Sequence, residues 1–266
     1  MKKSYYKIET SYANYYVEIW RQYSTVDKVY IGAQKKCIGF SIYLNEDGTA
    51  VMDEYPHMDG FGFHKHCNNE GNHLKGIGSV HLLNTSMRFI ISYYKLPEDI
   101  KFQFSDTSFI ECVNYNMPLP IYYIIFHGKT WYEQKFGAEP LMKSQSNLEE
   151  EKKALKAYLK GKPEIDNFFP VEQSKLKRRV LDIYAKCETL KECLDILKTE
   201  DCNVFKDWLP ILFSKFINLN HVNQWVISNK IPQESIKFSP LKSRPDKLFN
   251  LKGGDNHRLF FRRHDL

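Results

Sequence analysis

The sequence predicts an α+β protein in three parts: strands and helices over residues 1–145, an all-α helical domain over residues 146–232, and an extended basic tail over residues 233–266. Three observations support this division. Alternating apolar residues and turn residues occur in the first part, apolar residues recur at helical spacing in the second, and positive charge gathers in the third.

Strands and a helix are expected in the first part. The alternating run Lys36–Leu44 predicts a strand, and Asn45–Gly48 predicts a turn because glycine can adopt the positive φ that the turn needs. Thr49–Tyr55 then predicts the returning strand of a hairpin. After the polar loop Pro56–Lys75, the apolar residues of Ser79–Tyr94 follow the helical period and predict a helix.

Further elements follow in the same part. Ile100–Phe104 predicts a short strand, and Leu119–Lys135 predicts one helix, although Gly128 lowers the helix propensity of its middle. Beyond them, capping-box sequences at Ser146–Glu149 and Thr189–Glu192 predict helix starts. With a last short helix expected around Trp225, five helices would form a small bundle.

Composition limits the class of protein. Hydrophobic residues make up 42% of the chain, which is enough to form a core, yet no segment approaches the roughly 18 consecutive apolar residues of a membrane helix. The six cysteines are spread along the whole length and do not form a disulfide pattern. We therefore expect reduced cysteines, no membrane partner and a cytoplasmic location.

The tail carries most of the net charge of +6. Between Lys237 and Leu266 there are eight lysines or arginines and three aspartates. Residues 237–266 are therefore a candidate segment for binding a protein or a nucleic acid, with Phe260 and Phe261 placed among arginines where they could stack on bases. The alternative is a tail that folds back onto its own domain.

A glycine-containing segment precedes the helix expected at Ser79. The run His73-Leu74-Lys75-Gly76-Ile77-Gly78 leads directly into it. Glycines let the backbone approach a ligand closely, and the free N–H groups of a first helical turn favour an anion. A second motif, Thr130–Ala138, ends the helix predicted later in the same part.

In this order, with a strand between them, the two motifs resemble the GCN5-related N-acetyltransferases. The resemblance covers roughly residues 28–140 and implies an acetyltransferase-like mixed sheet with acetyl-CoA as cofactor. Gly76 and Gly78 match the glycines of the family's pyrophosphate loop, and Tyr132 matches a tyrosine that often serves as general acid. His73 departs from the family's Arg or Gln. The residues that the resemblance implies for cofactor binding are His73, Lys75, Gly76, Ile77, Gly78 and Ser79.

A direct acyl transfer would need a base for the acceptor amine and an acid for the thiolate. Asp53 or Glu54, on the strand expected before the loop, is the candidate base, and Tyr132 is the candidate acid. The alternatives are that the two carboxylates only face water and that the tyrosine only packs.

Histidines gather in and around the loop, at His57, His64, His66, His73 and His81, with a cysteine following His66. Zinc patterns use pairs of ligands separated by spacers, which this spacing fits poorly, so we expect no metal site.

Three functions remain open at this point. The first is an acyl-CoA-dependent N-acetyltransferase. The second is a catalytically inactive acetyltransferase-like structural or interaction protein, and the third is a nucleic-acid binder acting through its tail. The run Lys129–Ala138 also looks like uncharacterised proteins of large DNA viruses, which would place the protein in the host cytoplasm or a virus particle.

Overall fold

The computed structural model divides the 266-residue chain into two compact units. Unit 1 comprises Met1–Ser105, Lys135–Glu139 and Trp225–Phe260, and unit 2 comprises Asp106–Gln134, Pro140–Gln224 and Phe261–Leu266. The units differ from the division expected after residues 145 and 232, because the chain leaves unit 1 at Ser105 and returns to it twice. The structure describes residues 2–23, 25–33, 36–61, 77–106, 109–112, 115–141, 147–169, 174–200, 205–218, 224–228, 236–245 and 260–261.

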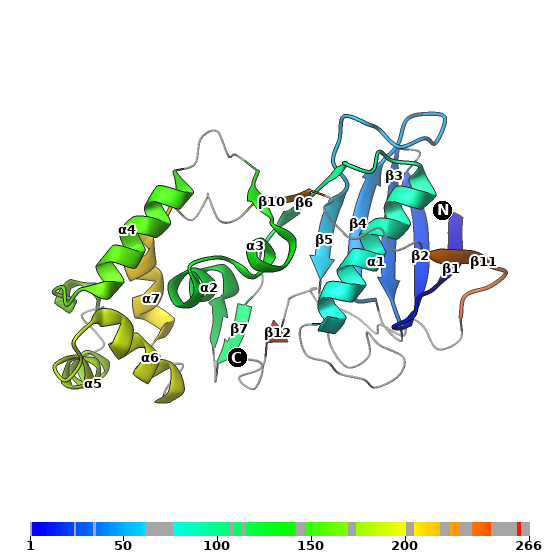
Figure 1. Cartoon of the computed structure of the whole chain (residues 1–266). Helices are drawn as coiled ribbons and strands as arrows, with labels where there is room; N and C mark the ends of the chain where they lie inside the picture. The colour runs from blue at the N-terminus through cyan, green and yellow to red at the C-terminus, as the bar shows by residue number, and fades with distance from the viewer. Residues whose placement is uncertain are drawn as a thin grey trace. The chain divides into compact units, whose positions relative to one another are not determined.

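A nine-stranded mixed sheet forms the body of unit 1, as Figure 1 shows. Its strands lie in the order β11, β1, β2, β3, β4, β5, β6, β10 and β9. Their bounds are β1 Lys2–Glu9, β2 Asn14–Tyr23, β3 Val26–Gly32, β4 Ile38–Tyr43, β5 His57–Phe61, β6 Lys101–Ser105, β9 Glu139–Pro140, β10 Gln224–Ser228 and β11 Lys237–Leu241. The expected α+β class with a mixed sheet is confirmed.

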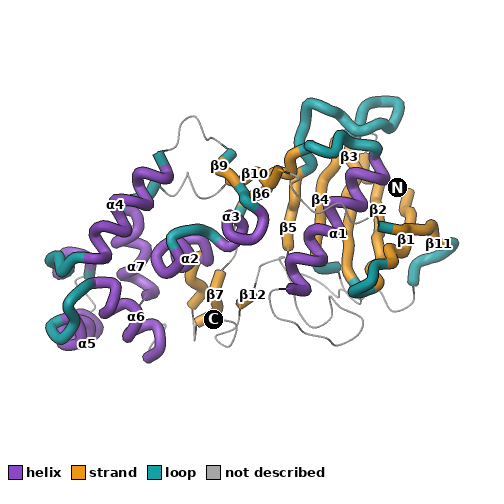
Figure 2. The backbone as a smooth tube through the Cα atoms, in the orientation of Figure 1, coloured by secondary structure: helices purple, strands orange, loops and turns teal. Residues whose placement is uncertain are grey.

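One helix, α1 (Ile77–Tyr94), connects the two strands that run parallel, β5 and β6. Parallel neighbours need such a crossover, whereas β1 to β5 form an antiparallel meander. The helix lies across the central strands in Figures 1 and 2. The predictions for this helix and for the strand β6 are confirmed to within two residues.

Apolar side chains from alternate strand positions form the core beneath α1. Val29 and Ile31 of β3 and Phe40 of β4 are buried, as are Met87 and Ile90 of the helix. Apolar residues recur at every second position in the strands and at every third or fourth position in the helix, so each set lies on one face of its element. The opposite face of the same strands therefore carries the polar positions.

The hairpin after β4 differs from the predicted one. The turn is present, with Gly48 at φ 84°, but it returns the chain only as far as the isolated bridge between Leu44 and Ala50. The strand expected at Thr49–Tyr55 is instead a loop, and β5 begins at His57. Pro56 has no N–H to donate to a sheet and directly precedes the strand.

The first part of the basic tail folds back onto unit 1. β11 pairs with β1 at the edge of the sheet, where Pro240 is tolerated because an edge strand has one unpaired side. Phe238 packs against Tyr6, Phe89 and Tyr93 at ring-centroid distances of 6.3, 5.0 and 6.4 Å. Residues 237–241 are thus part of the sheet and not of a free tail, and residues 246–259 and 262–266 lie outside the described chain.

Unit 2 combines helices with a three-stranded sheet of order β12, β7, β8. The elements assigned to it are β7 Phe109–Cys112, β8 Tyr115–Pro118, α2 Leu119–His127, α4 Leu148–Lys160, the 3-10 turn η3 Asp166–Phe168, α5 Ser174–Tyr184, α6 Leu190–Glu200 and α7 Phe205–Ser214, with β12 Phe260–Phe261 where the units meet in sequence. Helices α4 and α6 begin where the two capping-box sequences predict helix starts. The last predicted helix is wrong, because Trp225–Ile227 is a buried apolar run within β10.

The helix expected at Leu119–Lys135 is interrupted. Gly128 adopts φ 75° and ends α2, and α3 (Trp131–Phe136) starts a new helix. Thr130 and Glu133 form a reciprocal capping box, in which each side chain accepts a hydrogen bond from the other's backbone N–H, at 2.6 and 3.2 Å. The second carboxylate oxygen of Glu133 accepts a hydrogen bond from the buried ammonium of Lys152 in α4.

Two further expectations can be compared with the structure. None of the helices in the described residues is long and apolar enough to cross a membrane. Cys37 is disulfide-bonded, which corrects the expectation that the cysteines are reduced, whereas Cys187 and Cys193 are free and buried.

The docking of β11 predicts a loss of stability on truncation of its aromatic side chain. Phe238→Ala should lower the free energy of unfolding by about 2 kcal/mol, because it removes a ring from a four-ring cluster. Ser239→Ala, at the exposed neighbouring position, is the matched control and should change little. Urea denaturation measures both, and equal effects would mean that β11 does not pack as described.

The ion pair between Glu133 and Lys152 predicts that removing either of the two carboxylates that contact Lys152 lowers stability to a different extent. Glu133→Ala should cost about 3 kcal/mol, because it leaves a buried ammonium without its buried partner and removes half of a capping box. Glu149 also contacts Lys152, but its side chain is 81% exposed, so Glu149→Ala should cost much less. Thermal denaturation of the two variants compares them, and a larger loss for Glu149→Ala would contradict this ranking.

Candidate active site

A β-bulge in β5 supplies the acidic residue of the candidate site. Gly39 of β4 pairs with Gly60, and the next pair joins Phe40 to Met58, so Asp59 is an extra residue in β5. An extra residue changes which face the following side chains point to, because strand residues alternate between faces. Bulges of this kind re-aim side chains next to active sites.

The bulge satisfies two demands at once. Met58 and Phe61 are three positions apart, yet both are buried, which strict alternation would not permit. Asp59, the residue inserted between them, is partly exposed and contacts Ser41 of β4. The local geometry thus keeps two apolar residues in the core and presents a carboxylate on the polar face.

Three side chains, one from each of three adjacent strands, converge around this carboxylate. Ser41 Oγ lies 2.6 Å from both carboxylate oxygens, and Lys28 Nζ of β3 lies 3.0 Å from Oδ2. His57 Nδ1, at the start of β5, lies 3.2 Å from Oδ1 of the same carboxylate. Lys28 also donates to Ser41, so one hydrogen-bonded network links the four residues.

The network sets the charge of Asp59. Burial by itself would raise the pKa of this carboxyl, but the hydrogen bonds from His57, Ser41 and Lys28, with the positive charge of Lys28, lower the pKa below its ordinary value. The group is therefore an anion at neutral pH, and an ionised carboxylate only accepts hydrogen bonds.

This charge state defines the proton on His57. Because Asp59 can only accept, the 3.2 Å contact requires that Nδ1 of the imidazole carries the hydrogen. In the neutral ring Nε2 is then unprotonated and can take a proton from a substrate. The His57 and Asp59 side chains therefore have the arrangement of a general base and the carboxylate that orients it.

The same contacts exclude a serine-hydrolase arrangement. A nucleophilic serine needs its hydroxyl hydrogen-bonded to the imidazole that removes its proton. Ser41 is instead bonded to the carboxylate of Asp59 and accepts from Lys28. Its side chain is buried, so its role is to position Asp59.

The carboxylates predicted from the sequence lie elsewhere. Asp53 and Glu54 are exposed residues of the loop between Ala50 and His57 and are not on a strand. Asp59 lies on the strand that precedes α1, where the sequence analysis expected its base to be. The signal for this residue was the single glycine Gly60 within an otherwise strand-like run, which is typical of a bulge.

The proposed cofactor loop is described only in part. His73, Lys75 and Gly76 lie outside the described residues, as do His64, His66 and Cys67. Ile77 begins α1, and Gly78 and Ser79 are buried in its first turn. The last two residues of the glycine motif, Ile77 and Gly78, therefore belong to the first turn of α1. Backbone N–H groups in a first helical turn have no acceptor within the helix.

Tyr132 is a buried residue of α3. Its side chain is 2% exposed, and burial raises the pKa of the phenol well above its ordinary value, with a further contribution from Asp106. A phenol that holds its proton this strongly is a poor general acid. The run around it contains the capping box and ion pair of Glu133.

No metal-binding group of three or more His, Cys, Asp or Glu residues occurs in the described ranges. Of the clustered histidines, His57 contacts Asp59, while Nδ1 of His81 lies 2.9 Å from the hydroxyl of Tyr15. Comparison of the chain with protein-family models, with curated proteins and with solved structures finds no match. The assignment of the site consequently rests on its geometry.

The lowered pKa of Asp59 predicts a pH-dependent contribution to stability. A carboxyl with a depressed pKa in the folded state stabilises the fold at pH values above its unfolded pKa of about 4, and this contribution disappears as the pH falls through the folded value. Asp59→Asn should therefore be less stable than the wild type at pH 7, with a difference that shrinks towards pH 3. Unfolding free energies across this range test it, and a difference independent of pH would contradict the assigned charge.

Proposed function

We propose that this chain is an acyl-CoA-dependent N-acyltransferase whose general base is His57, oriented by Asp59. The observation that carries the proposal is the position of the bulge and its dyad beside the parallel strands β5 and β6. The cofactor and the fold resemblance are those expected from the sequence. The assignment of the base is new and replaces Asp53 and Glu54.

The pairing of the parallel strands supports a ligand site beyond Phe61, at the carboxyl end of β5 and at the opposite end of that strand from His57. β5 and β6 pair only at His57 with Gln103 and Met58 with Phe104, although β5 continues to Phe61. In sheets with parallel strands and crossover helices, ligands bind outside the carboxyl ends of the strands. An acetyltransferase-like fold is expected to have a parallel pair that diverges, and short pairing agrees with this.

The first turn of α1 supports a site for the anionic part of the cofactor. A helix that crosses over between parallel strands starts on the side of their carboxyl ends, next to the same opening. The free N–H groups there favour phosphate, and Gly78 has no side chain to obstruct the approach.

The reaction can be written with these groups. Nε2 of His57 removes a proton from the acceptor amine, the amine nitrogen attacks the thioester carbonyl carbon, and the carbon–sulfur bond breaks as the amide forms. The leaving thiolate has a conjugate acid of pKa about 8.5, so it departs without a strong acid catalyst. The burial of Tyr132 is compatible with this chemistry.

Paired variants of neighbouring carboxylates test the proposal. With acetyl-CoA and a panel of polyamines and lysine peptides, release of the CoA thiol should fall at least about 100-fold in Asp59→Asn and His57→Gln. Glu54→Gln and Asp53→Asn are matched controls on an exposed loop and should retain the wild-type rate. Loss of activity in the controls but not in Asp59→Asn would restore the base assigned from the sequence.

A binding measurement separates catalysis from the cofactor site. Acetyl-CoA should raise the melting temperature of the wild type by mass action, and Gly78→Asp, if folded, should lose this stabilisation. Asp59→Asn should keep it, because Asp59 orients His57, which acts on the acceptor amine and not on the cofactor. A wild type that neither turns over nor is stabilised at millimolar acetyl-CoA would favour the inactive structural protein.

A further inference from the structure

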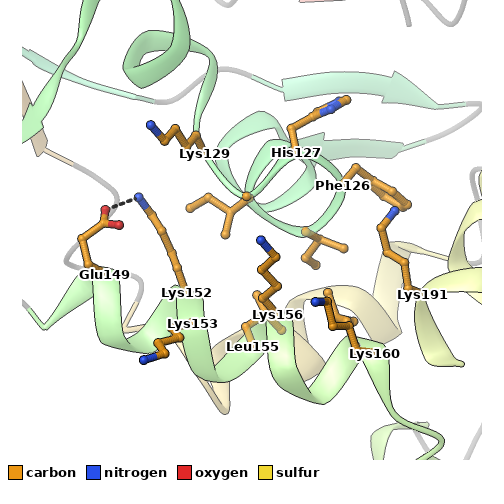
Figure 3. A pocket seen from close by; sticks show the side chains of 14 residues that line it. Phe126, His127, Lys129, Glu149, Lys152, Lys153, Leu155, Lys156, Lys160 and Lys191 are labelled. Atoms are coloured by element: carbon orange, nitrogen blue, oxygen red, sulfur yellow. Dashed lines mark hydrogen bonds and ion pairs between the residues drawn. The ribbon is translucent and has the colours of Figure 1, made fainter.

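A pocket lies wholly within unit 2, between α2 and α4 (Figure 3). Its volume of about 520 Å³ falls in the range of small-molecule sites. Six lysines line it, namely Lys129 after α2, Lys152, Lys153, Lys156 and Lys160 of α4, and Lys191 of α6. Glu149 is the only acidic residue of the lining.

The wall of the pocket is apolar. Ile124 and Ile125 of α2 face Leu155 and Leu159 of α4 across it, and all four side chains are buried. Apolar walls with a few charged groups are typical of ligand sites and exclude water from around the charges. Helical spacing on α4 places Lys152, Leu155, Lys156, Leu159 and Lys160 along one side.

Most of the positive charge is not neutralised. Lys152 is bound by Glu133 and Glu149, and Lys191 pairs with Asp195 one turn along α6. In the part of the chain that the structure describes, the other four lysines of the lining form no ion pair. Repulsion among such cations favours any anion that enters between them.

The side chains themselves differ in direction. Lys156 extends from α4 into the middle of the pocket, whereas Lys153 points away from it (Figure 3). Lys191 lies beside the ring of Phe126, with its ammonium 5.1 Å from the ring centroid. The pKa of His127 at the rim is lowered by burial and by the charges of Lys198 and Lys191, which agrees with a positive potential there.

We propose that this pocket binds a small molecule that carries several phosphate groups and an apolar portion. Separated ammonium groups match the separated charges of a polyphosphate, and lysine is a common phosphate-binding residue. The isoleucine and leucine wall would contact the apolar portion. The site belongs to unit 2 and does not depend on the dyad of unit 1.

Calorimetric titration of the full chain with tripolyphosphate and with ATP tests the proposal. Both should bind with a stoichiometry of one, ATP the more tightly because of its additional contact with the apolar wall. Lys156→Ala combined with Lys160→Ala should weaken both at least about tenfold, because it removes two ammonium groups that have no ion-pair partner in the described residues and are available to the phosphates. Both lysines are exposed on α4, so circular dichroism should show an unchanged fold.

The control variant is Lys186→Ala, which removes an exposed lysine of the same unit that does not line the pocket. It should bind as the wild type does, as should Asp59→Asn. Absence of saturable binding below about 1 mM, or equal weakening by Lys186→Ala, would overturn the proposal. So would tight binding of single-stranded RNA without binding of tripolyphosphate, which would indicate an open basic surface.

Discussion

The requirement that one face of the meander stay buried beneath α1 determines much of unit 1. The strands beneath the helix present mainly apolar residues at alternate positions, and β5 keeps both Met58 and Phe61 buried by inserting Asp59 as an extra residue. The same insertion gives a carboxylate to the polar face, where Lys28 and Ser41 hold it and His57 joins it. The packing of the core and the chemistry of the candidate site therefore have a common origin.

In unit 2, too, a single residue has two structural roles. Glu133 caps α3 and neutralises the ammonium of Lys152, a side chain that would otherwise be an unpaired buried charge. This carboxylate binds Lys152, so the cations of the lining that are available to a ligand are those without an ion pair, such as Lys156 and Lys160. A residue that stabilises the fold thus shapes the charge distribution of a separate surface.

The sequence predicted the elements whose signals are local. The periodicity of α1 and the turn at Gly48 were sufficient, whereas Gly128 indicated only a weak point in one continuous helix and not the break between α2 and α3. The passage of the chain from unit 1 to unit 2 and back could not be predicted from local signals. Strands such as β10 form only by pairing with strands that are distant in the sequence. Asp59 was missed because a bulge depends on the register of two strands, and the pocket because its lysines belong to three separate segments.

The pairing of β11 with β1 joins one of the last described segments of the chain to the first. During synthesis one edge of β1 stays unpaired until about 230 further residues have been added, which takes roughly 10 to 50 seconds at ordinary elongation rates. Throughout this interval an unpaired strand is available to other chains. Completion of the sheet covers that edge with a strand containing Pro240, whose missing N–H limits further strand addition. Vulnerability to misassembly is thereby confined to the nascent protein.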